Sequence, residues 1–560
     1  MKRLFRKKSL WIVLFVVLLG SAATWAFKPA DHYFAIVKSL DIFASVFRDL
    51  DAYYVDSIQP EDLINTGIEA MTGSLDPYTY FYAEDDLDNL AFQATGKYAG
   101  VGISILQEGD STLVGDVYEG SPMQQAGIKV GDILLSLDGK TLHGLSEQAV
   151  SDLLKGEPGT VLEVAVRNPV SGKERALKIR RAEINIQSVP YAGLLADHIG
   201  YIKMAQFTEY SSHEVETALR KMMDKDRQLQ GLVLDLRNNP GGLLEEAVKT
   251  ANLFIDEGKT IVSTHGKVGS WNRVYKTSAL PLDDSLHLVI LTNRMTASAS
   301  EIVAGAVQDM DRGLIVGQRS FGKGLVQTTR DLPYHTKIKI TTARYYTPSG
   351  RCIQAIDYMH RHEDGSVGLI PDSLKKEFRT EHGRIVSDGG GIAPDVETKP
   401  VYFSNIAITL LKHNYIFDYA TQYCYAHPSE GDKLPFSLGE AGFSDFMKFM
   451  DGKDYVYKTR SEMALDDFKK AAEEEQYFAA SQKEFDALQS KVKHDKHQDI
   501  LKHKDEIRHL LEEEIASRYQ LREGRIMQGL PYDPAVQKAL ALLQQPSAYD
   551  SLLHLSVAGQ

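Results

Sequence analysis

Two serines stand directly before a stretch with helical apolar spacing, in the segment TASASEIVAGAVQD at residues 296–309. A serine hydroxyl becomes a nucleophile when a base lies beside it, and the N-terminus of a helix offers backbone N–H groups that stabilise negative charge. Ser298 and Glu301 also form the S-x-x-E pattern of a capping box, which is the purely structural interpretation. The segment alone is typical of a helix cap, so a nucleophile has to be argued from other residues.

A pair of glycines, Gly241 and Gly242, follows a buried-strand pattern in LVLDLRNNPGGLLEEAV, at the junction with a helical stretch. Glycines at such a junction let backbone N–H groups face a cleft, which is what a tetrahedral oxyanion requires. The competing interpretation is a turn that needs positive φ.

Lys323 lies between two glycines in GQRSFGKGLVQTTRDL. Most lysines are solvated surface charges, and the phosphate-binding pattern G-x-x-x-x-G-K-[ST] is absent. A lysine can accept a proton from serine if burial lowers its pKa from about 10.4 to roughly 7. No Ser-His-Asp set of recognisable spacing is visible, although the sequence leaves three core histidines open as partners: His265, His287 and His335.

Another glycine-rich segment, YAGVGISI, places Gly100, Val101 and Gly102 directly before a strand that begins near Ile103. Backbone N–H groups there can hold a carboxylate while an extended peptide adds to the strand edge. The next segment, EGSPMQQAGIKVGDILLSLDGK, resembles the signature of PDZ domains, which implies recognition of a protein C-terminus. A β-rich module with ordinary glycine turns is the alternative.

Together and in this order, the motifs closely resemble those of the C-terminal processing peptidases, or tail-specific proteases, over residues 31–400. The resemblance implies Ser298 as the nucleophile, Lys323 as the general base and Gln327 as the residue that orients the lysine. It also implies an oxyanion hole among Gly241, Gly242 and the N–H of Ala299.

Two further residues match the family pattern more loosely. Asp309 corresponds to an aspartate often grouped with the dyad, and it lies three helical turns beyond Ser298, so a same-face role is geometrically reasonable although we favour a structural one. Arg167, in the last strands of the PDZ-like segment, corresponds to an arginine that links peptide binding to the active site.

The elements that must position these residues indicate an α+β or α/β multidomain chain, with a PDZ-like β-rich domain inserted before an α/β peptidase core. Helical regions are expected at both ends. The expected boundaries are 31–83 for an N-terminal helical segment, 84–183 for the PDZ domain, 184–400 for the core with a surface insertion at 355–390, and 401–560 for a helical C-terminal region.

The first 27 residues carry five basic side chains followed by an apolar run, which predicts a signal peptide or a membrane anchor. No clean cleavage site is visible, so a membrane tether through the N-terminus stays open. We expect the body of the protein in the bacterial periplasm or on the outer face of the cytoplasmic membrane.

The charge count, 63 basic against 76 acidic residues, argues against a nucleic-acid partner. The resemblance to the C-terminal processing peptidases implies a serine endopeptidase that cleaves exported proteins near their C-termini and needs no metal or other cofactor. Its partners would be protein or peptide C-termini, and its helical end leaves a homodimer open. The alternative is a catalytically inactive PDZ scaffold that binds C-termini.

Overall fold

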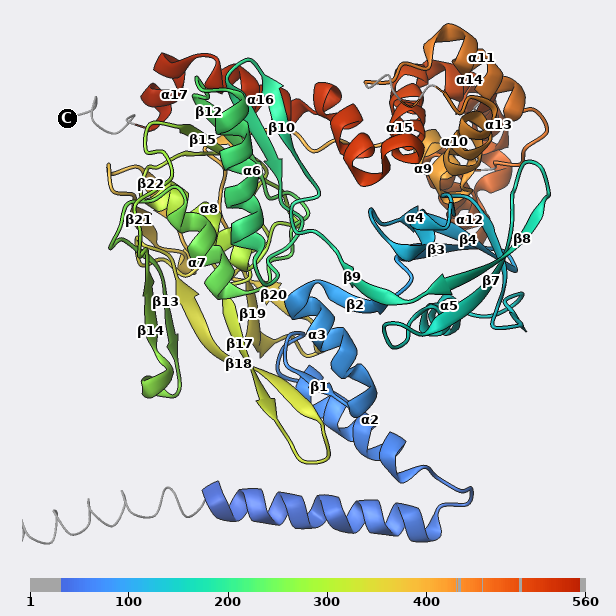
Figure 1. Ribbon diagram of the computed structural model, residues 1–560. Helices are drawn as coiled ribbons and strands as arrows, with labels where there is room; N and C mark the ends of the chain where they lie inside the picture. Colours follow the sequence, from blue (N-terminus) through green and yellow to red (C-terminus); the bar gives the residue numbers. More distant parts are fainter. Residues whose placement is uncertain (1–31, 430, 432–434, 456, 493–495, 554–560) are drawn as a thin grey trace, which may run out of the picture. The chain divides into compact units, whose positions relative to one another are not determined.

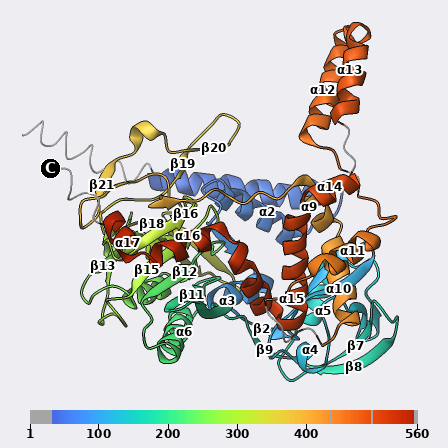
Figure 2. The same cartoon turned by 90° about the horizontal axis from the view of Figure 1, so that it is seen from above.

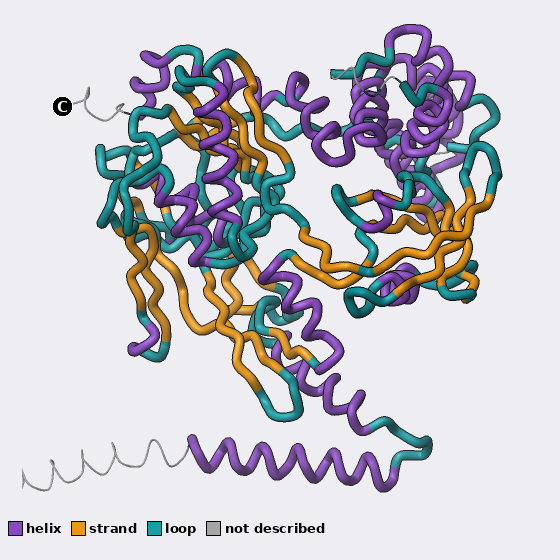
Figure 3. Tube along the Cα trace, viewed as in Figure 1, coloured by secondary structure: helices purple, strands orange, loops and turns teal. Residues whose placement is uncertain are grey.

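A computed structural model describes residues 32–429, 431, 435–455, 457–492 and 496–553. The segment expected to direct export, residues 1–27, lies outside them. The chain divides into two bodies, Met1–Phe81 and Tyr82–Gln560. The second body contains both helices and strands, which confirms the expected fold class (Figures 1 and 3). In the described part of the chain no helix is both long and apolar enough to cross a membrane.

The first body contains a helix over residues 32–53 and helix α2 (Pro60–Gly73). Pro60 occupies the first position of α2, where its missing N–H costs nothing, and Glu61 and Asp62 complement the helix dipole. The two helices touch, since a Cβ placed on Gly67 would lie 3.5 Å from the ring of Phe43.

The β-rich module of the second body has a sheet in the order β3-β4-β5-β7-β8 with antiparallel pairs, which makes β3 an edge strand. Its core is a single apolar cluster, and α5 lies beside β3. The strand pair β2–β9 joins the start and the end of the module. The strand β1 (Tyr80–Tyr82) spans the boundary between the two bodies and is not part of this sheet. The elements that follow it are η1 (Glu84–Asp86), α3 (Leu87–Thr95), β2 (Lys97–Gly100), β3 (Ile103–Glu108), β4 (Ser111–Val117), α4 (Pro122–Gln125), β5 (Ile133–Leu137), β6 (Lys140–Thr141), α5 (Glu147–Leu154), β7 (Val161–Arg167), β8 (Glu174–Arg180) and β9 (Ala182–Asn185).

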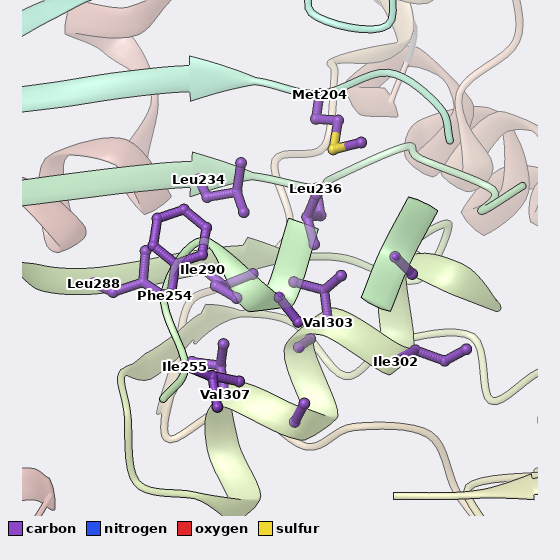
Figure 4. Packing of buried hydrophobic residues seen from close by; sticks show 14 of the residues in the cluster. Met204, Leu234, Leu236, Phe254, Ile255, Leu288, Ile290, Ile302, Val303 and Val307 are labelled. Atoms are coloured by element: carbon purple, nitrogen blue, oxygen red, sulfur yellow. The ribbon is translucent and has the colours of Figure 1, made fainter. Parts of the chain in front are cut away.

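A six-stranded sheet in the order β10-β11-β12-β15-β16-β23 forms the centre of the second body, parallel except for the edge strand β10. Its strands are nearly continuous apolar runs because both faces are covered. Residues of α6, α7 and α8 pack on one face; Figure 4 shows Val303 beside Ile290 and Val307 beside Ile255. The elements are β10 (Tyr191–Ala196), β11 (Ile199–Lys203), α6 (Ser211–Lys225), β12 (Gly231–Asp235), α7 (Leu244–Asn252), β15 (His287–Thr292), α8 (Ala299–Asp309), β16 (Leu314–Gly317) and β23 (Val396–Glu397).

A second sheet carries the strands that flank the lysine loop: β17 pairs with β18, β18 with β13, and β13 with β14, all antiparallel. Short hairpins and a turn fill the polar insertion after it. The elements are β13 (Thr260–Gly266), η2 (Gly269–Trp271), β14 (Arg273–Lys276), β17 (Leu325–Asp331), β18 (Lys337–Tyr346), β19 (Ile356–Arg361), β20 (Val367–Leu369), η3 (Asp372–Leu374), β21 (Glu377–Arg379) and β22 (Ile385–Ser387).

The rest of the chain is helical, and its parts serve two purposes. Helices α9, α10, α11, α14 and α15 share one apolar cluster, and α12 and α13 lie side by side as a hairpin (Figure 2). The last two helices, α16 and α17, instead cover the second face of the six-stranded sheet. The elements are α9 (Asn405–Lys412), α10 (Tyr415–Ala426), α11 (Gly439–Phe449), α12 (Arg460–Glu474), α13 (Phe478–Val492), α14 (Lys496–Lys502), α15 (Lys504–Gly529), η4 (Leu530–Tyr532), α16 (Pro534–Leu543) and α17 (Pro546–Leu553).

Candidate active site

Ser298 forms the sharp turn between β15 and α8, with φ 56° and ψ −116°. A non-glycine residue in this region carries strain of roughly 1–3 kcal/mol, and such strain collects at functional sites. The turn is held from both sides, because the Ser298 carbonyl accepts hydrogen bonds from the Tyr345 hydroxyl at 3.2 Å and from the Ile302 N–H at 3.0 Å. The side chain is half-buried, so a substrate can reach it.

Ser300, the second serine of the segment, is fully buried. Its hydroxyl donates to the backbone carbonyl of Asn239 at 3.1 Å. The structure therefore separates the two serines, since only Ser298 stands at the entrance of the helix.

The Glu301 carboxylate connects the serine turn to the lysine loop. Its Oε2 atom accepts hydrogen bonds from the backbone N–H of Ser298 at 2.8 Å and of Lys323 at 2.9 Å. Two nitrogens bound to the same oxygen cannot lie farther apart than the sum of those distances. One side chain thus brings together the backbones of two residues that are distant in sequence.

The other oxygen of the same carboxylate holds the preceding part of the lysine loop. Glu301 Oε1 accepts from the Ser320 hydroxyl at 2.5 Å and from the Gly322 N–H at 2.7 Å. Glu301 is 0% exposed, and burial raises its pKa to about 6 while the hydrogen bonds it accepts favour the ionised form. Near neutral pH it is therefore a buried carboxylate stabilised by four donors.

The glycines beside Lys323 allow neighbouring chain segments to approach closely. A Cβ on Gly322 would lie 2.4 Å from the Cβ of Ala355, and one on Gly324 would lie 2.8 Å from the backbone nitrogen of Gln354. The Gln354 side chain in turn accepts from the Gly324 N–H at 2.8 Å. The lysine loop is therefore fixed from both flanks.

Of the three oxyanion-hole candidates, Gly241 permits a close approach to Ser298, and its N–H is not free to bind an oxyanion. A Cβ on Gly241, whose φ is +101°, would lie 2.8 Å from the Cβ of Ser298, so only glycine fits. Its own N–H donates to Asn239 Oδ1 at 2.9 Å. The N–H groups of Gly242 and Ala299 have no acceptor among the described residues, and Gly242 is exposed. These two donors stay available to a substrate.

Gln327 lies on β17, where its Nε2 donates to Thr341 Oγ1 of β18 at 3.2 Å. Another half-buried lysine, Lys203, is a competitor for the role of base, because burial lowers its pKa. Its ammonium group, however, lies 3.1 Å from Asp235 Oδ1 and donates to the Arg237 carbonyl at 2.7 Å. We therefore assign Lys203 to an ion-pair cluster at the ends of β11 and β12.

Asp309 lies at the far end of α8 from Ser298. Its carboxylate binds Arg351 at 2.7 Å, the Thr347 hydroxyl at 2.5 Å and the Ser349 N–H at 3.0 Å. Since Asp309 and Arg351 are both buried, these contacts anchor the chain that follows β18. The structure does not bring Asp309 to the serine turn.

The three core histidines lie elsewhere. His265 packs edge-on against Tyr346, His335 lies in the exposed turn between β17 and β18, and His287 stands at the opposite end of β15 from Ser298. None of them hydrogen-bonds Ser298 within the described residues. The same part of the chain contains no group of three or more His, Cys, Asp or Glu residues that could hold a metal ion.

The glycine loop of the β-rich module is a tight turn packed against Ser121. Gly102 has φ +79°, and a Cβ there would lie 2.2 Å from the Cβ of Ser121. The carbonyls of Val101 and Gly102 accept from the N–H groups of Met123 and Tyr118. The apolar side chains of Val101 and Ile103 are buried in the module core, while Gly100 lies under the Tyr98 ring.

Arg167 stands at the end of β7, opposite Ile133 of β5 and Glu174 of β8. It forms no ion pair within the described residues, so its coupling role stays a prediction.

Sequence reasoning recognised Glu301 only as half of a capping box and missed its contacts with the lysine loop. The one available signal was its acidic type at the third helical position, which a helix cap explains equally well. Asn239 and Gln354, which fix the two glycine segments, gave no signal in the sequence.

Three family models match the chain. Peptidase family S41 matches residues 198–365, a PDZ domain matches 113–168, and the C-terminal helical domain described for a probable PDZ-protease matches 406–543. These three matches correspond, respectively, to the core with the six-stranded sheet, to the β-rich module and to the C-terminal helical region.

Relatives of known name are similar over much of the chain. The carboxy-terminal-processing protease of Bartonella bacilliformis is 34% identical over 342 residues, covering 61% of this chain and 76% of the relative. The chloroplastic C-terminal processing peptidase of Tetradesmus obliquus is 34% identical, covering 50% of this chain and 63% of the relative. A probable CtpA-like serine protease of Staphylococcus aureus is 33% identical, covering 56% and 63%. The match thus spans less than two thirds of the latter two relatives. The chain is a serine-type peptidase and belongs to peptidase family S41, the family of the carboxy-terminal-processing proteases.

Proposed function

We propose that this peptidase cleaves exported proteins near their C-termini with a Ser298–Lys323 dyad. Residues 184–400 would carry out catalysis, and residues 84–183 would recognise the tail of the substrate. The observation that carries the proposal is the shared Glu301 Oε2 atom, which binds the backbone N–H groups of Ser298 and Lys323.

In the first step, Ser298 Oγ attacks the carbonyl carbon of the scissile bond while Lys323 Nζ, in its neutral form, takes the hydroxyl proton. The oxyanion is stabilised by the N–H groups of Gly242 and Ala299. Lys323 returns the proton to the leaving amine, which departs with the C-terminal fragment. Water then hydrolyses the acyl-enzyme, with Lys323 acting again as base and then as acid.

Gln327 would position Lys323 in this scheme. One of its two amide N–H donors is given to Thr341, and its carbonyl oxygen would accept a hydrogen bond from the lysine. This arrangement adds no charge beside a base that has to be neutral.

Tail recognition would take place on the edge strand β3, where an extended peptide can pair with free backbone groups beside α5. The carbonyls of Val101 and Gly102 face the module, toward Met123 and Tyr118. In an extended chain a carbonyl and the N–H that follows it point in opposite directions. The N–H groups of Gly102 and Ile103 therefore belong to the side from which a terminal carboxylate would be bound.

The dyad is tested with Ser298→Ala and Lys323→Met variants of the full chain, with Ser300→Ala as the matched control. Cleavage of a protein with an apolar unstructured tail and labelling by a serine-reactive phosphonate would be measured. We expect Ser298→Ala to abolish both, Lys323→Met to abolish cleavage, and Ser300→Ala to keep both. Full cleavage in either dyad variant would exclude the dyad, and a folded parent chain without cleavage or labelling would favour the inactive scaffold.

Tail recognition is tested separately with a substrate whose C-terminal carboxylate is converted to an amide. We expect KM to be higher for the amide than for the acid. As a reference, kcat for a short internal peptide should stay unchanged. Equal KM values for the acid and the amide would exclude carboxylate recognition without affecting the dyad.

A further inference from the structure

A cavity of about 510 Å³ lies at the C-terminal end of α8, the end opposite Ser298. Four arginines line it: Arg319, Arg351, and Arg379 and Arg384 of the β21–β22 hairpin. Asp395 is the one carboxylate among its lining residues, which also include the apolar side chains of Ile385, Val386, Ala393, Pro394 and Leu552.

Two of these arginines already have carboxylate partners. Arg351 binds Asp309 at 2.7 Å, and Arg384 binds Asp311 at 2.6 Å and Asp395 at 2.5 Å. Asp311 and Asp395 thus share the single guanidinium of Arg384.

The other two arginines are exposed, and within the described residues their hydrogen-bond acceptors are backbone carbonyls. Arg319 donates to the Gly390 carbonyl at 3.1 Å, and Arg379 donates to the Gly383 carbonyl at 3.0 Å. Neither forms an ion pair within the described residues. Each guanidinium has five N–H donors, so most of their donors still lack a protein partner.

A buried nitrogen of the same cluster also lacks an acceptor. Arg351 is 1% exposed, and its Nε atom has no hydrogen-bond partner among the described residues. A buried donor without a partner is costly. The lining thus combines two exposed arginines that form no ion pair within the described residues, a buried arginine and apolar side chains.

We propose that this cavity binds a small organic anion, with its oxyanion group on Arg319 and Arg379 and its short apolar body against Val386 and Leu552. The planar guanidinium fork suits both carboxylate and phosphate. This binding site is independent of the dyad and goes beyond the proposed peptidase function.

A ligand here would also affect the lysine loop. Arg319 directly precedes Ser320, whose hydroxyl donates to Glu301 and accepts from the Ile392 N–H at 2.7 Å. Fixing the Arg319 side chain would therefore stabilise the segment that leads to Lys323.

The proposal is tested by calorimetric titration of the full chain carrying Ser298→Ala, which prevents self-cleavage. Hexanoate and hexyl phosphate are the two probes, in chloride buffer of constant ionic strength. The double variant Arg319→Gln/Arg379→Gln removes the two cationic groups. Arg361→Gln is the matched control, because Arg361 is exposed and donates to a carbonyl four residues onward, as Arg379 does.

We expect one molecule of at least one probe to bind, about tenfold or more weakly in the double variant and unchanged in the control. The tighter probe identifies the carboxylate or the phosphate as the preferred head group. No saturable binding to the parent chain, or equal binding by the double variant, would overturn the proposal. Circular dichroism checks the fold, and Arg379→Gln alone replaces the double variant if the latter does not fold.

Discussion

The two ends of α8 each hold a buried carboxylate, and the two carboxylates bind different parts of the molecule. Glu301, near the N-terminus, accepts from Ser298, Ser320, Gly322 and Lys323, all in the serine turn or the lysine loop. Asp309, at the C-terminus, binds Arg351 and the turn after β18. The family pattern groups Asp309 with the dyad, although we favour a structural role for it, and the S-x-x-E pattern makes Glu301 a helix cap. The contacts tie Glu301 to the serine turn and the lysine loop, and Asp309 to the chain after β18.

The largest difference is expected from matched amide substitutions at the two ends. A glutamine at position 301 has one carbonyl oxygen and an NH₂ group that must face N–H donors, so the serine turn and the lysine loop lose their common anchor. We expect Glu301→Gln to lower kcat about a thousandfold, comparable to the loss of an oxyanion donor. Asp309→Asn should lower kcat of the folded chain far less. Equal losses of kcat in the two variants would contradict the comparison.

The second expectation concerns stability at the other end of the helix. Asp309→Asn leaves Arg351 as a buried charge without its carboxylate, and breaking a buried pair costs about 3 kcal/mol or more. We expect the unfolding transition of the peptidase core, followed by calorimetry, to shift to lower temperature. Replacing Asp331, an exposed partner of Lys337, by asparagine serves as the control and should have little effect. An unchanged transition in Asp309→Asn would show that the buried pair adds no stability.

The third expectation follows from the raised pKa of Glu301. Its folded-state value of about 6 lies above the ordinary 4.5, so the folded state binds this proton more tightly than the unfolded state. The stability from this group is complete below pH 4.5 and is lost as the pH rises through 6, by about 2 kcal/mol. Because Glu301→Gln cannot ionise, the difference in core stability between the parent and this variant should change over that range and stay constant above it. A difference independent of pH would contradict the assignment.

Much of the architecture could be predicted from local sequence. The alternating apolar runs and helical stretches of the core, and the glycine turns of the β-rich module, specify their own elements. The Gly241–Gly242 junction was also recognisable, because positive φ and close approach restrict those positions to glycine.

Contacts between distant segments could not be predicted in the same way. The Glu301 contacts with Gly322 and Lys323 depend on how β16 and α8 pack. The Gly241 N–H is not available to an oxyanion, because it donates to the side chain of Asn239, whose rotamer the sequence does not reveal. The placement of α16 and α17 on the second face of the sheet is likewise a tertiary result, since their apolar faces fit several partners.

The smallest expected effect separates the two serines at the helix entrance, which the sequence pattern could not do. Ser300→Ala removes one buried hydrogen bond, to the Asn239 carbonyl, which also accepts from the Ala297 N–H at 3.0 Å. Because the carbonyl keeps that second donor, the loss should be about 1 kcal/mol of stability, with kcat nearly unchanged. Thermal unfolding and peptide cleavage measure the two quantities on the same sample. A loss of kcat as large as in Glu301→Gln would mean that the buried Ser300 takes part in catalysis. The separate roles of Ser298 and Ser300 would then be wrong.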